Sequence, residues 1–438
     1  MRARHRPATL EVTVYKRLSI LLLSAKVATN GSTSRPEDTH GTSSMSIITD
    51  VEVIAFSFKV PDLGLGKHRT MGVSNLLYEK GASLEVMRYA VRLGTDDGLE
   101  GAYVTHWVGT HSALGQTVML APTLLGRNAE HRQAIYDDLK REARAYDHMG
   151  HGPLDIALWD LVGRKYGISV GSMLGAHKDR LPTYASTHHG QDEPGGLHSV
   201  EAFADYAIAC RERGFRGFKI HGWHDGNKKR EAAVVLRVRE VAGDAIDIMV
   251  DPACELRTWA DALYVGRACD EANCLWYEDP YRDAGVSVQG QRLLREKLKT
   301  PLLVSEHIRG PEQKAAFATA GGCDMIHADP EYDLGITGLM KIAHLGESLG
   351  MDVQVHACGP AHRFCVAAMS NTHFYELALV GPDMPNLIPP VYTCGYSDQH
   401  DAVDASGCVP VPKGPGLGVS YDWDFIRKNA VSKKHFRS

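Results

Sequence analysis

Three acidic residues stand where three short apolar runs of this chain give way to polar residues. DIMVD ends at Asp251, CLWYED reaches Glu278 and TPLLVSE ends at Glu306. Each run has the pattern of a buried strand, and about one strand-and-helix unit separates it from the next. Acids at the carboxyl ends of successive parallel strands converge at the mouth of a barrel. Because unpaired carboxylates repel one another and a hard divalent cation prefers oxygen ligands, the spacing predicts a metal site.

Ionisable residues also stand at the ends of other predicted strands. Lys219 and His221 share one face of the second strand of the predicted barrel because strand side chains alternate. The sixth, seventh and eighth strands carry Asp329, His356 and Glu376. A single acid after a strand is usually a turn or helix cap. Ionisable groups of both signs on seven consecutive strands, all near one barrel end, instead predict a common site.

Asp329 and His356 are the most informative pair in this set. A carboxylate that bonds an imidazole fixes its tautomer and raises its basicity, which suits a general base near neutral pH. The alternative for His356 is a structural histidine of the core. Lys219, flanked by Phe218 and Ile220, is expected to hold a substrate carboxylate and offset developing negative charge. Its alternative is a surface lysine that keeps its charge in water.

The elements that must position these residues alternate between strands and amphipathic helices. The strand candidates after Leu181 are LPTYAST, FRGFKIHG, AIDIMVD, CLWYEDP, TPLLVSEH, CDMIHAD, DVQVHA and FYELAL. Their spacing of roughly 20 to 35 residues predicts a closed parallel barrel of α/β class. An open doubly wound sheet is the alternative, but no GxGxxG turn follows a strand, which disfavours a dinucleotide-binding domain.

A different pattern precedes the barrel. Residues 46 to about 110 carry strand patterns, and the Asp96-Asp97-Gly98 turn predicts an antiparallel hairpin. Helical periodicity follows from about residue 115 to 175. The chain is thus expected to divide into an α+β domain at 46–175 and a barrel at 176–409. The glycine-rich segment 64–75 is either an exposed loop or a lid that closes over the barrel mouth and selects substrates.

Length, charge and cysteine content are consistent with these interpretations and exclude some other classes of protein. The chain has 438 residues, 44% of them hydrophobic, which suffices for a barrel of roughly 250 residues and a second domain. A net charge of -5 gives no reason to expect nucleic acid, and no apolar run approaches the length of a membrane span. Nine cysteines without paired spacing predict reduced thiols in a cytoplasmic protein.

The first 44 residues form a separate segment in composition. Basic residues precede a short apolar run at 18–25, and a Ser/Thr/Gly stretch follows up to Ser44. This pattern is compatible with a weak signal or transit peptide, but a disordered leader or an over-long start assignment is more usual. Order is therefore expected from Met45 onward.

Several motifs together resemble the enolase superfamily. They are GPLDIALWDLVGRKYGISVGSMLGAHKDRLPTYAS at 152–186, the TDDGLEG hairpin and the late GPGLGV. The match runs from about residue 46 to the end and is specific to the mandelate racemase-like branch, which contains most acid-sugar dehydratases. The resemblance implies a (β/α)7β-type TIM barrel with an N-terminal capping domain, completed by residues 410–438. It also implies one Mg²⁺ per subunit and a homo-oligomer.

The resemblance also assigns roles to individual residues. Asp251, Glu278 and Glu306 would be the magnesium ligands, Asp329 and His356 the catalytic dyad, Glu376 the acid on the enolate side of the substrate, and Lys219 the first lysine of a Lys-x-Lys motif. Three positions depart from the family pattern. His221 replaces the second lysine, Ser305 stands where glycine commonly precedes the third ligand, and Ala253 replaces a familiar asparagine.

These features predict metal-dependent removal of the α-proton of a hydroxylated carboxylate. The strategy of this superfamily, a lysine or histidine base with a metal ion that stabilises the enediolate, is a known chemical pattern. Dehydration of a sugar acid is the leading hypothesis, because one dyad is clear and the second lysine is lost. A racemase, epimerase or lactone cycloisomerase that uses His221 and His356 on opposite faces is the alternative, and a non-catalytic binding protein is a remote one. Candidate substrate contacts are His188, His189, Trp223, His224, His307 and Arg309.

Overall fold

The computed structural model describes most of the chain from Met45 onward. The described ranges are 45–65, 76–107, 110–223, 225–282, 287–382, 384 and 386–438. The expected leader at 1–44, residues 66–75 of the candidate lid, and His224 lie outside these ranges. In the described part, every helix is too short or too polar to cross a membrane.

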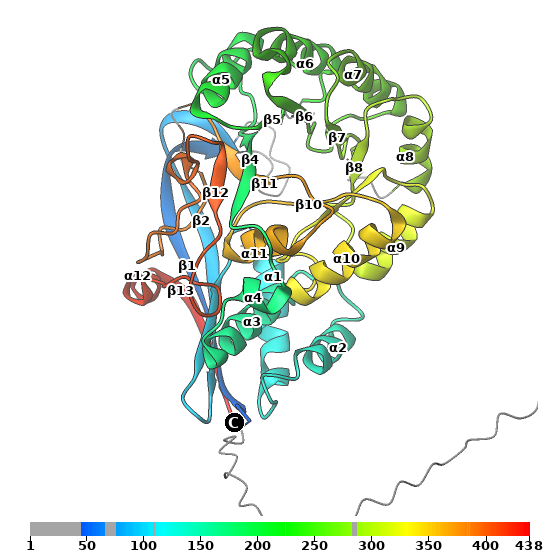
Figure 1. The fold of residues 1–438 in the computed structure, drawn as a ribbon. Coiled ribbons are helices and arrows are strands. Elements are labelled where there is room, and N and C mark those ends of the chain that lie inside the picture. Colours follow the sequence, from blue (N-terminus) through cyan, green and yellow to red (C-terminus); the bar gives the residue numbers. More distant parts are fainter. Residues whose placement is uncertain are drawn as a thin grey trace, which may run out of the picture. The chain divides into compact units, whose positions relative to one another are not determined.

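Eight parallel strands form a curled sheet in the middle of the chain (Figure 1). They are β4 (Arg180–Thr187), β5 (Gly217–Ile220), β6 (Asp247–Val250), β7 (Trp276–Glu278), β8 (Leu302–Val304), β9 (Met325–Ala328), β10 (Val353–Val355) and β11 (Tyr375–Val380). Each matches a strand predicted from the sequence. Their order is β10-β9-β8-β7-β6-β5-β4-β11.

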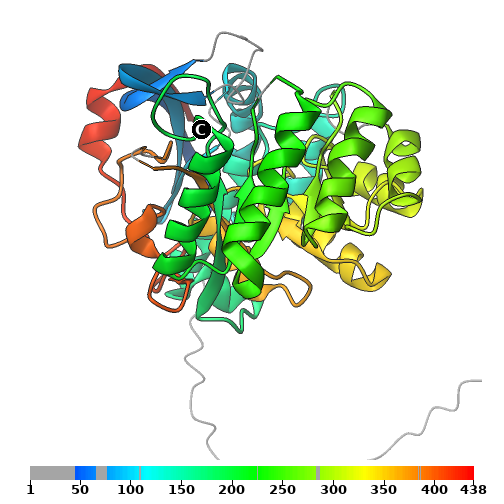
Figure 2. The same cartoon turned by 90° about the horizontal axis from the view of Figure 1, so that it is seen from above.

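Seven helices connect these strands and lie outside the curled sheet. They are α5 (Val200–Arg213), α6 (Lys228–Ala242), α7 (Trp259–Glu271), α8 (Val288–Arg295), α9 (Pro311–Thr319), α10 (Gly335–Leu349) and α11 (Pro360–Ala368). Figure 2 shows the green helices of this set side by side on the outer surface. The alternation confirms the predicted (β/α)7β architecture, in which every strand but the last is followed by a helix.

The ring of strands differs from a fully hydrogen-bonded barrel at one seam. Among the described residues no ladder joins β10 to β11. Side chains bridge this seam instead: Ala357 N donates to Glu376 Oε2 at 2.5 Å, and Gly359 N donates to the Tyr375 hydroxyl at 2.8 Å. Glu376, which the sequence predicts as a site residue, thus helps to join β10 to β11.

The barrel interior is apolar below the level of the predicted site. One buried cluster consists of Tyr184, Met249, Trp276, Leu303, Met325 and Phe374. Because side chains two residues apart share a face, Asp251 and Glu278 lie one layer above Met249 and Trp276. The Trp276 indole N–H donates to Glu278 Oε2 at 2.9 Å. The apolar layer therefore forms a floor that excludes water from beneath the acids.

The N-terminal region forms a four-stranded antiparallel sheet with the end of the chain. Its order is β13-β1-β2-β3, with β1 (Ile48–Leu65), β2 (Leu76–Thr95), β3 (Glu100–Val104) and β13 (Ala430–Arg437). The predicted hairpin is confirmed as β2–β3. The first two strands are longer than the sequence pattern indicated. After a register shift between Pro61 and Leu63 their ladder continues to Leu65 paired with Leu76, because Asp62, at φ 54°, accommodates a bulge.

Short elements complete the described chain. They are α1 (His111–Leu120), a 3₁₀ turn (Ala121–Leu124), α2 (Arg132–Glu142), α3 (Gly152–Tyr166), α4 (Val170–Leu174), 3₁₀ turns at Gly243–Ala245 and His400–Ala402, β12 (Cys408–Pro410) and α12 (Trp423–Lys428). Two of them, α2 and α3, are the helices predicted from periodicity. β12 pairs with β4.

Helix α3 is the junction between the sheet and the barrel. Its Asp160 accepts hydrogen bonds from Ala102 N at 2.9 Å and Leu417 N at 2.8 Å, so it joins β3 to the late GPGLGV segment. Asp155 on the same helix accepts from Thr337 N of α10 at 3.0 Å. Buried carboxylates of this kind need several donors to be stable, and these contacts give the long motif at 152–186 a structural role.

Candidate functional site

Lys219 lies at the centre of a ring of carboxylates at the carboxyl ends of the strands. Its Nζ is 2.9 Å from Glu278 Oε1, 2.9 Å from Glu376 Oε1 and 3.7 Å from Asp251 Oδ2. The side chain is 0% exposed, so the alternative of a surface lysine does not hold. Burial lowers the pKa of Lys219, but Glu278 and Glu376 outweigh burial and hold it well above its usual value. The ammonium is therefore charged.

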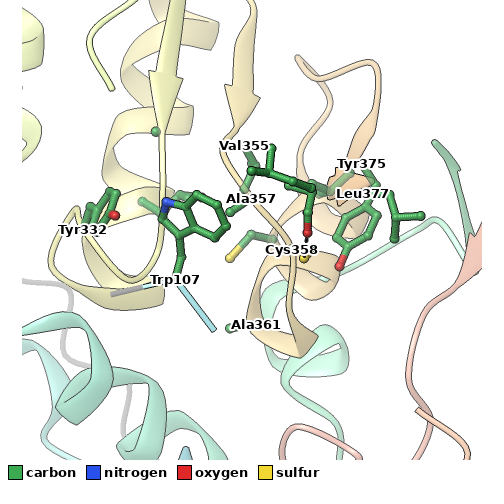
Figure 3. Close-up of a cluster of buried hydrophobic side chains, with 14 of the residues drawn as sticks. Trp107, Tyr332, Val355, Ala357, Cys358, Ala361, Tyr375 and Leu377 are labelled. Atoms are coloured by element: carbon green, nitrogen blue, oxygen red, sulfur yellow. Dashed lines mark hydrogen bonds between the residues drawn. The ribbon is translucent and has the colours of Figure 1, made fainter. Parts of the chain in front are cut away.

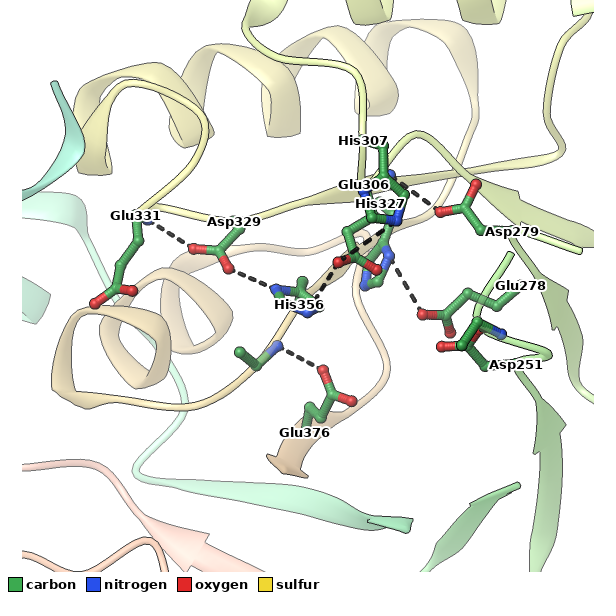
Figure 4. Close-up of polar contacts among 12 residues, drawn as sticks. Asp251, Glu278, Asp279, Glu306, His307, His327, Asp329, Glu331, His356 and Glu376 are labelled. Carbon is green, nitrogen blue, oxygen red and sulfur yellow. Dashed lines mark hydrogen bonds and ion pairs between the residues drawn. The ribbon is translucent and has the colours of Figure 1, made fainter. Parts of the chain in front are cut away.

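Three possible ligand atoms converge beside this lysine. Glu278, Glu306 and His327 each place one such atom within 4.8 Å of the other two. Asp251, the third acid predicted from the sequence, is not one of these three; its Oδ2 is 3.0 Å from His221 Nε2 and 3.7 Å from Lys219 Nζ. The structure thus brings the predicted acids together and adds a histidine to them (Figure 4).

The electrostatics of these acids show why the group would suit a cation. Burial raises the pKa of Glu278 well above its usual range, and Asp251 raises it further, although Lys219 opposes both. Burial also raises the pKa of Glu306, but the neighbouring histidines, His356 first among them, lower it to about 2. A hard divalent cation would relieve the repulsion among buried acids and accept their oxygen atoms as ligands.

Left-handed backbone positions set the direction of two of these acids. Ser305 has φ 98° and precedes Glu306, and Ala253 has φ 49° and follows Asp251. Strand alternation from Leu303 would point Ser305 inward; the turn at Ser305 brings Glu306 in instead. These are the two positions where the family pattern favours glycine and asparagine, the residue types that adopt positive φ most readily.

A backbone contact at Ala253 also holds the first of these acids. Ala253 N donates to Asp251 Oδ1 at 2.7 Å. Glycine and asparagine would adopt these conformations more easily, and alanine at positive φ costs about 1–2 kcal/mol. In this chain the positive φ values at Ser305 and Ala253 are therefore adopted by residues other than glycine and asparagine.

His356 and Asp329 form the predicted dyad. His356 Nδ1 is 2.6 Å from Asp329 Oδ2, and His356 Nε2 is 3.4 Å from Glu306 Oε1 (Figure 4). Burial lowers the pKa of His356, but Glu306 and Asp329 outweigh burial and raise it to about 10. Burial raises the pKa of Asp329, but His362 and His356 hold it far below its usual range. Since Asp329 engages Nδ1, the nitrogen that faces the carboxylate cluster is Nε2.

Aromatic rings hold the His356 imidazole in place. Tyr332 stacks on it with ring centres 5.6 Å apart and an interplanar angle of 19°, and Trp107 meets it edge-on at 5.7 Å. Arg309 in turn lies over Tyr332, 4.3 Å from its ring centre. Figure 3 shows Trp107 and Tyr332 beside the buried cluster that includes Ala357. Trp107 and Tyr332 were not predicted from the sequence, because no local pattern reports a contact between residues so far apart in the chain.

His221 lies on the opposite flank of the acids from His356. Its Nδ1 is 2.7 Å from the Thr187 carbonyl oxygen, and its Nε2 is 3.0 Å from Asp251 Oδ2. A carbonyl oxygen only accepts, so Nδ1 carries a proton and Nε2 faces the carboxylate. His189 lies beside it, with ring centres 4.9 Å apart and Nδ1 2.9 Å from the His221 carbonyl oxygen.

The other candidate substrate contacts differ in exposure and in their partners. His188 is buried after β4, and His307 is exposed with Nε2 3.8 Å from Glu306 Oε1. Trp223 packs against Phe203 at 5.0 Å between ring centres, and its indole N–H donates to the Gln191 carbonyl oxygen at 3.1 Å. Trp223 is thus engaged in loop and helix packing.

His327 is a site residue that sequence reasoning missed. It lies on β9, is 0% exposed, and its Nδ1 is 3.5 Å from Glu278 Oε1. Burial lowers the pKa of His327 to about 3, so the imidazole is neutral near pH 7. The signal was present in CDMIHAD, because alternation places Met325, His327 and Asp329 on one face of the strand.

Two family models cover most of the described chain. The model described as Enolase C-terminal domain-like matches residues 202–425, and the Mandelate racemase / muconate lactonizing enzyme, N-terminal domain model matches residues 83–175. The chain belongs to the enolase superfamily. This membership confirms the resemblance and the fold, and within the superfamily the match is to the mandelate racemase-like branch.

Individual superfamily relatives show what this protein is similar to. L-talarate/galactarate dehydratase of Salmonella typhimurium is 25% identical over 292 residues, which are 65% of this chain and 71% of the relative. The magnesium complex of D-glucarate dehydratase from Agrobacterium tumefaciens has a TM-score of 0.75 and 28% identity, and the match covers 89% of this chain and 100% of that chain. An isomerase from Streptomyces coelicolor has a TM-score of 0.70 and 25% identity, with 88% and 97% covered.

Proposed function

We propose that this enolase superfamily member is a hydro-lyase that dehydrates a sugar acid to a 2-keto-3-deoxy acid. The observation that carries the proposal is the dyad: Asp329 holds His356 Nδ1 at 2.6 Å, which leaves Nε2 directed at the carboxylate cluster. Charged Lys219 lies within the same ring of strand ends. The dehydratase names of the relatives agree with this chemistry.

One Mg²⁺ per subunit, held by Asp251, Glu278 and Glu306, is the proposed cofactor. The fit rests on acids at three successive strand ends, of which Asp251 and Glu278 are buried, and on the pKa of Glu278, which burial and the neighbouring acids raise. The magnesium complex of the glucarate dehydratase is consistent with this. When bound, the cation supplies positive charge that stabilises the enediolate of a substrate carboxylate.

His356 is the proposed base. Its Nε2 takes the α-proton as the Cα–H bond breaks, and the electron pair of that bond moves toward the substrate carboxylate. Lys219 adds a fixed positive charge beside that developing negative charge. Glu376, which Lys219 and Ala357 N hold in place, is proposed to contact the enolate side of the substrate.

The second half of the reaction is loss of the neighbouring hydroxyl. The C–O bond breaks, the hydroxyl takes a proton and leaves as water, and the resulting enol becomes the keto acid. Either of two histidines can donate the proton that the leaving hydroxyl takes. His356 can return the proton it took, for a syn elimination, or His221 can donate from the other flank, for an anti elimination.

The direct test is a product assay with Mg²⁺ and a panel of mono- and diacid sugars. The proposal expects a 2-keto acid from at least one of them, and a loss of about 10²–10⁴-fold in rate in His356→Gln because a positioned base contributes that much. A panel that yields no keto acid with the metal-loaded protein would count against dehydration.

An isomerase is the second candidate, and two observations favour it. His221 and His356 lie on opposite flanks of the acids, as a two-base racemase or epimerase requires, and the Streptomyces coelicolor isomerase is similar in fold and sequence. In that case His221→Gln should slow α-proton exchange selectively for one stereoisomer. Equal loss for both stereoisomers would exclude the two-base mechanism.

The partner and the organisation of the chain complete the proposal. We propose that the partner is a small-molecule carboxylate, contacted by residues among His188, His189, Trp223, His224, His307 and Arg309. We propose a cytoplasmic, homo-oligomeric protein with a capping domain at 46–175, a barrel at 176–409 and a C-terminal segment at 410–438. The pairing of β13 with β1 supports the last point, because it places the chain end in the N-terminal sheet.

A further inference from the structure

His327 is a buried imidazole whose polar atoms have no hydrogen-bond partner among the described residues. The side chain is 0% exposed, and neither Nδ1 nor Nε2 has a hydrogen-bond partner. Buried polar atoms in folded proteins are nearly always paired, and leaving one unpaired costs about 1–3 kcal/mol. A histidine kept in this state at the carboxyl end of a barrel strand therefore indicates a ligand that the side chains around it do not supply.

The location of His327 indicates the kind of ligand. One of its ring nitrogens and one oxygen each of Glu278 and Glu306 all lie within 4.8 Å of one another. An octahedral ion with bonds of about 2.1 Å has trans ligands about 4.2 Å apart and cis ligands closer. One cation can therefore touch all three side chains after small rotations. Figure 4 shows His327 between Glu278 and Glu306, with its ring turned toward both.

The chain also fixes the backbone and ring of His327. Its carbonyl oxygen accepts hydrogen bonds from Ser305 Oγ at 3.1 Å and from Lys314 Nζ at 2.5 Å, and β9 pairs with β10 at Gln354. The ring meets the His356 ring edge-on, with centres 5.3 Å apart and an interplanar angle of 82°. Because these contacts fix both the backbone and the ring, the imidazole of His327 is already positioned before a ligand binds, as metal-binding side chains need to be.

We infer that His327 supplies an imidazole nitrogen to the cation of this site, beside the oxygens of Glu278 and Glu306, and so shifts the preference of the site from Mg²⁺ toward Mn²⁺. Mg²⁺ takes oxygen ligands and loses its water reluctantly, whereas imidazole suits transition ions. Mn²⁺ is the transition ion that shares with Mg²⁺ the preference for carboxylate oxygen, so a site with two carboxylates and one imidazole favours it. This inference rests on the metal site in the proposed function and adds a nitrogen ligand to the oxygen trio that the family implies.

The first test is spectroscopic and uses the full chain loaded with Mn²⁺, without substrate. Pulsed electron paramagnetic resonance detects a nitrogen nucleus bonded to Mn²⁺ through its modulation of the electron spin echo. Directly coordinated nitrogen is expected in the wild type and should be absent in His327→Gln. His307→Gln is the matched control, because His307 also lies beside Glu306, and it should keep the signal. A wild type without coordinated nitrogen, or a signal that survives in His327→Gln, would overturn the inference.

The second test is the ratio of the dissociation constants for Mg²⁺ and Mn²⁺, measured by calorimetry. Wild type should favour Mn²⁺, and His327→Gln should lower this ratio by about tenfold or more, the scale on which metal-site residues act. His307→Gln should leave the ratio unchanged. An unchanged ratio in His327→Gln would contradict the inference.

Two further points cover a variant that does not fold and the dependence on the proposed reaction. If His327→Gln does not fold, the nitrogen is assigned by elimination: the signal must survive in His307→Gln, His221→Gln and His356→Gln, and its loss in any of them would overturn the inference. The measurements contain no substrate, so they are independent of the reaction. Coordinated nitrogen without dehydration would refute only the proposed function, and dehydration without coordinated nitrogen would refute only the role of His327.

Discussion

The charge on His356 depends on carboxylates that follow two other strands. Asp329 follows β9 and engages Nδ1, while Glu306 follows β8 and faces Nε2 at 3.4 Å. Burial alone would lower the pKa of this histidine, yet the two carboxylates raise it to about 10. In the absence of metal the imidazolium is therefore stable. A cation on Glu306 would lower this pKa and leave more of the imidazole neutral and able to accept a proton.

A pH titration of stability tests this charge in chelator-treated, metal-free protein. The folded-state pKa of His356, about 10, exceeds the ordinary value of about 6.5. Its contribution to the free energy of unfolding is thus complete below pH 6.5 and is lost as the pH rises toward 10. Urea unfolding between pH 7 and 10 should show a steeper decline in wild type than in His356→Gln. Parallel declines would show that the histidine is not charged in the metal-free protein.

At the scale of elements, strand ends explain both what the sequence predicts and what it does not. Alternating apolar runs identify all eight barrel strands, and the polar residue that ends a run identifies Asp251, Glu278 and Asp329. Glu306 also ends an apolar run, but it points into the site only because Ser305 adopts φ 98°. Sequence periodicity does not predict this backbone conformation. His327 lies inside a run and was missed, since a histidine flanked by apolar residues is usually structural.

The junction between β3 and α3 provides a prediction about stability. A Cβ at Gly101 would lie 2.4 Å from Leu161 Cβ and 2.6 Å from Leu161 N, so the strand and helix would have to separate. Gly101→Ala should destabilise the protein by about 2–3 kcal/mol, as overpacking does. Denaturant unfolding measures the change.

Gly115 is the matched control for that substitution. It lies exposed within α1, and a Cβ there would meet nothing within 4 Å. Gly115→Ala should stabilise the protein by about 0.5–1 kcal/mol, because alanine loses less entropy in a helix. If Gly101→Ala did not destabilise the protein, the close approach of β3 to α3 would be refuted.

At the scale of the whole described chain, the site depends on contacts between distant regions. Glu331, after β9, accepts hydrogen bonds from the Tyr103 hydroxyl at 2.7 Å, His106 N at 2.7 Å and Trp107 N at 2.8 Å. This carboxylate fixes the end of β3 against the barrel and brings Trp107 to the His356 ring. Sequence patterns are local, so the identity of these partners could not be predicted.

Metal binding should stabilise the whole fold. Asp251 and Glu278 are buried and Glu306 is partly exposed, and a cation relieves the repulsion among these acids. Binding to the folded state alone adds about 2.7 kcal/mol at a concentration one hundred times the dissociation constant. The melting temperature of wild type should therefore rise with Mg²⁺ or Mn²⁺. Glu278→Gln should lose most of this dependence. If the melting temperature of wild type did not change with either ion, the proposed metal site would be contradicted.

The central claim is that the dyad removes an α-proton and that the same substrate then loses water. The measurement that tests it most directly is incubation with metal and acid sugars in heavy water, followed by mass spectrometry of recovered substrate and assay of 2-keto acid. The account predicts a keto acid in wild type, and a rate of keto acid formation and of deuterium uptake about 10²–10⁴-fold lower in His356→Gln. Metal-dependent deuterium uptake without keto acid, for every acid that reacts, would contradict dehydration and identify an isomerase.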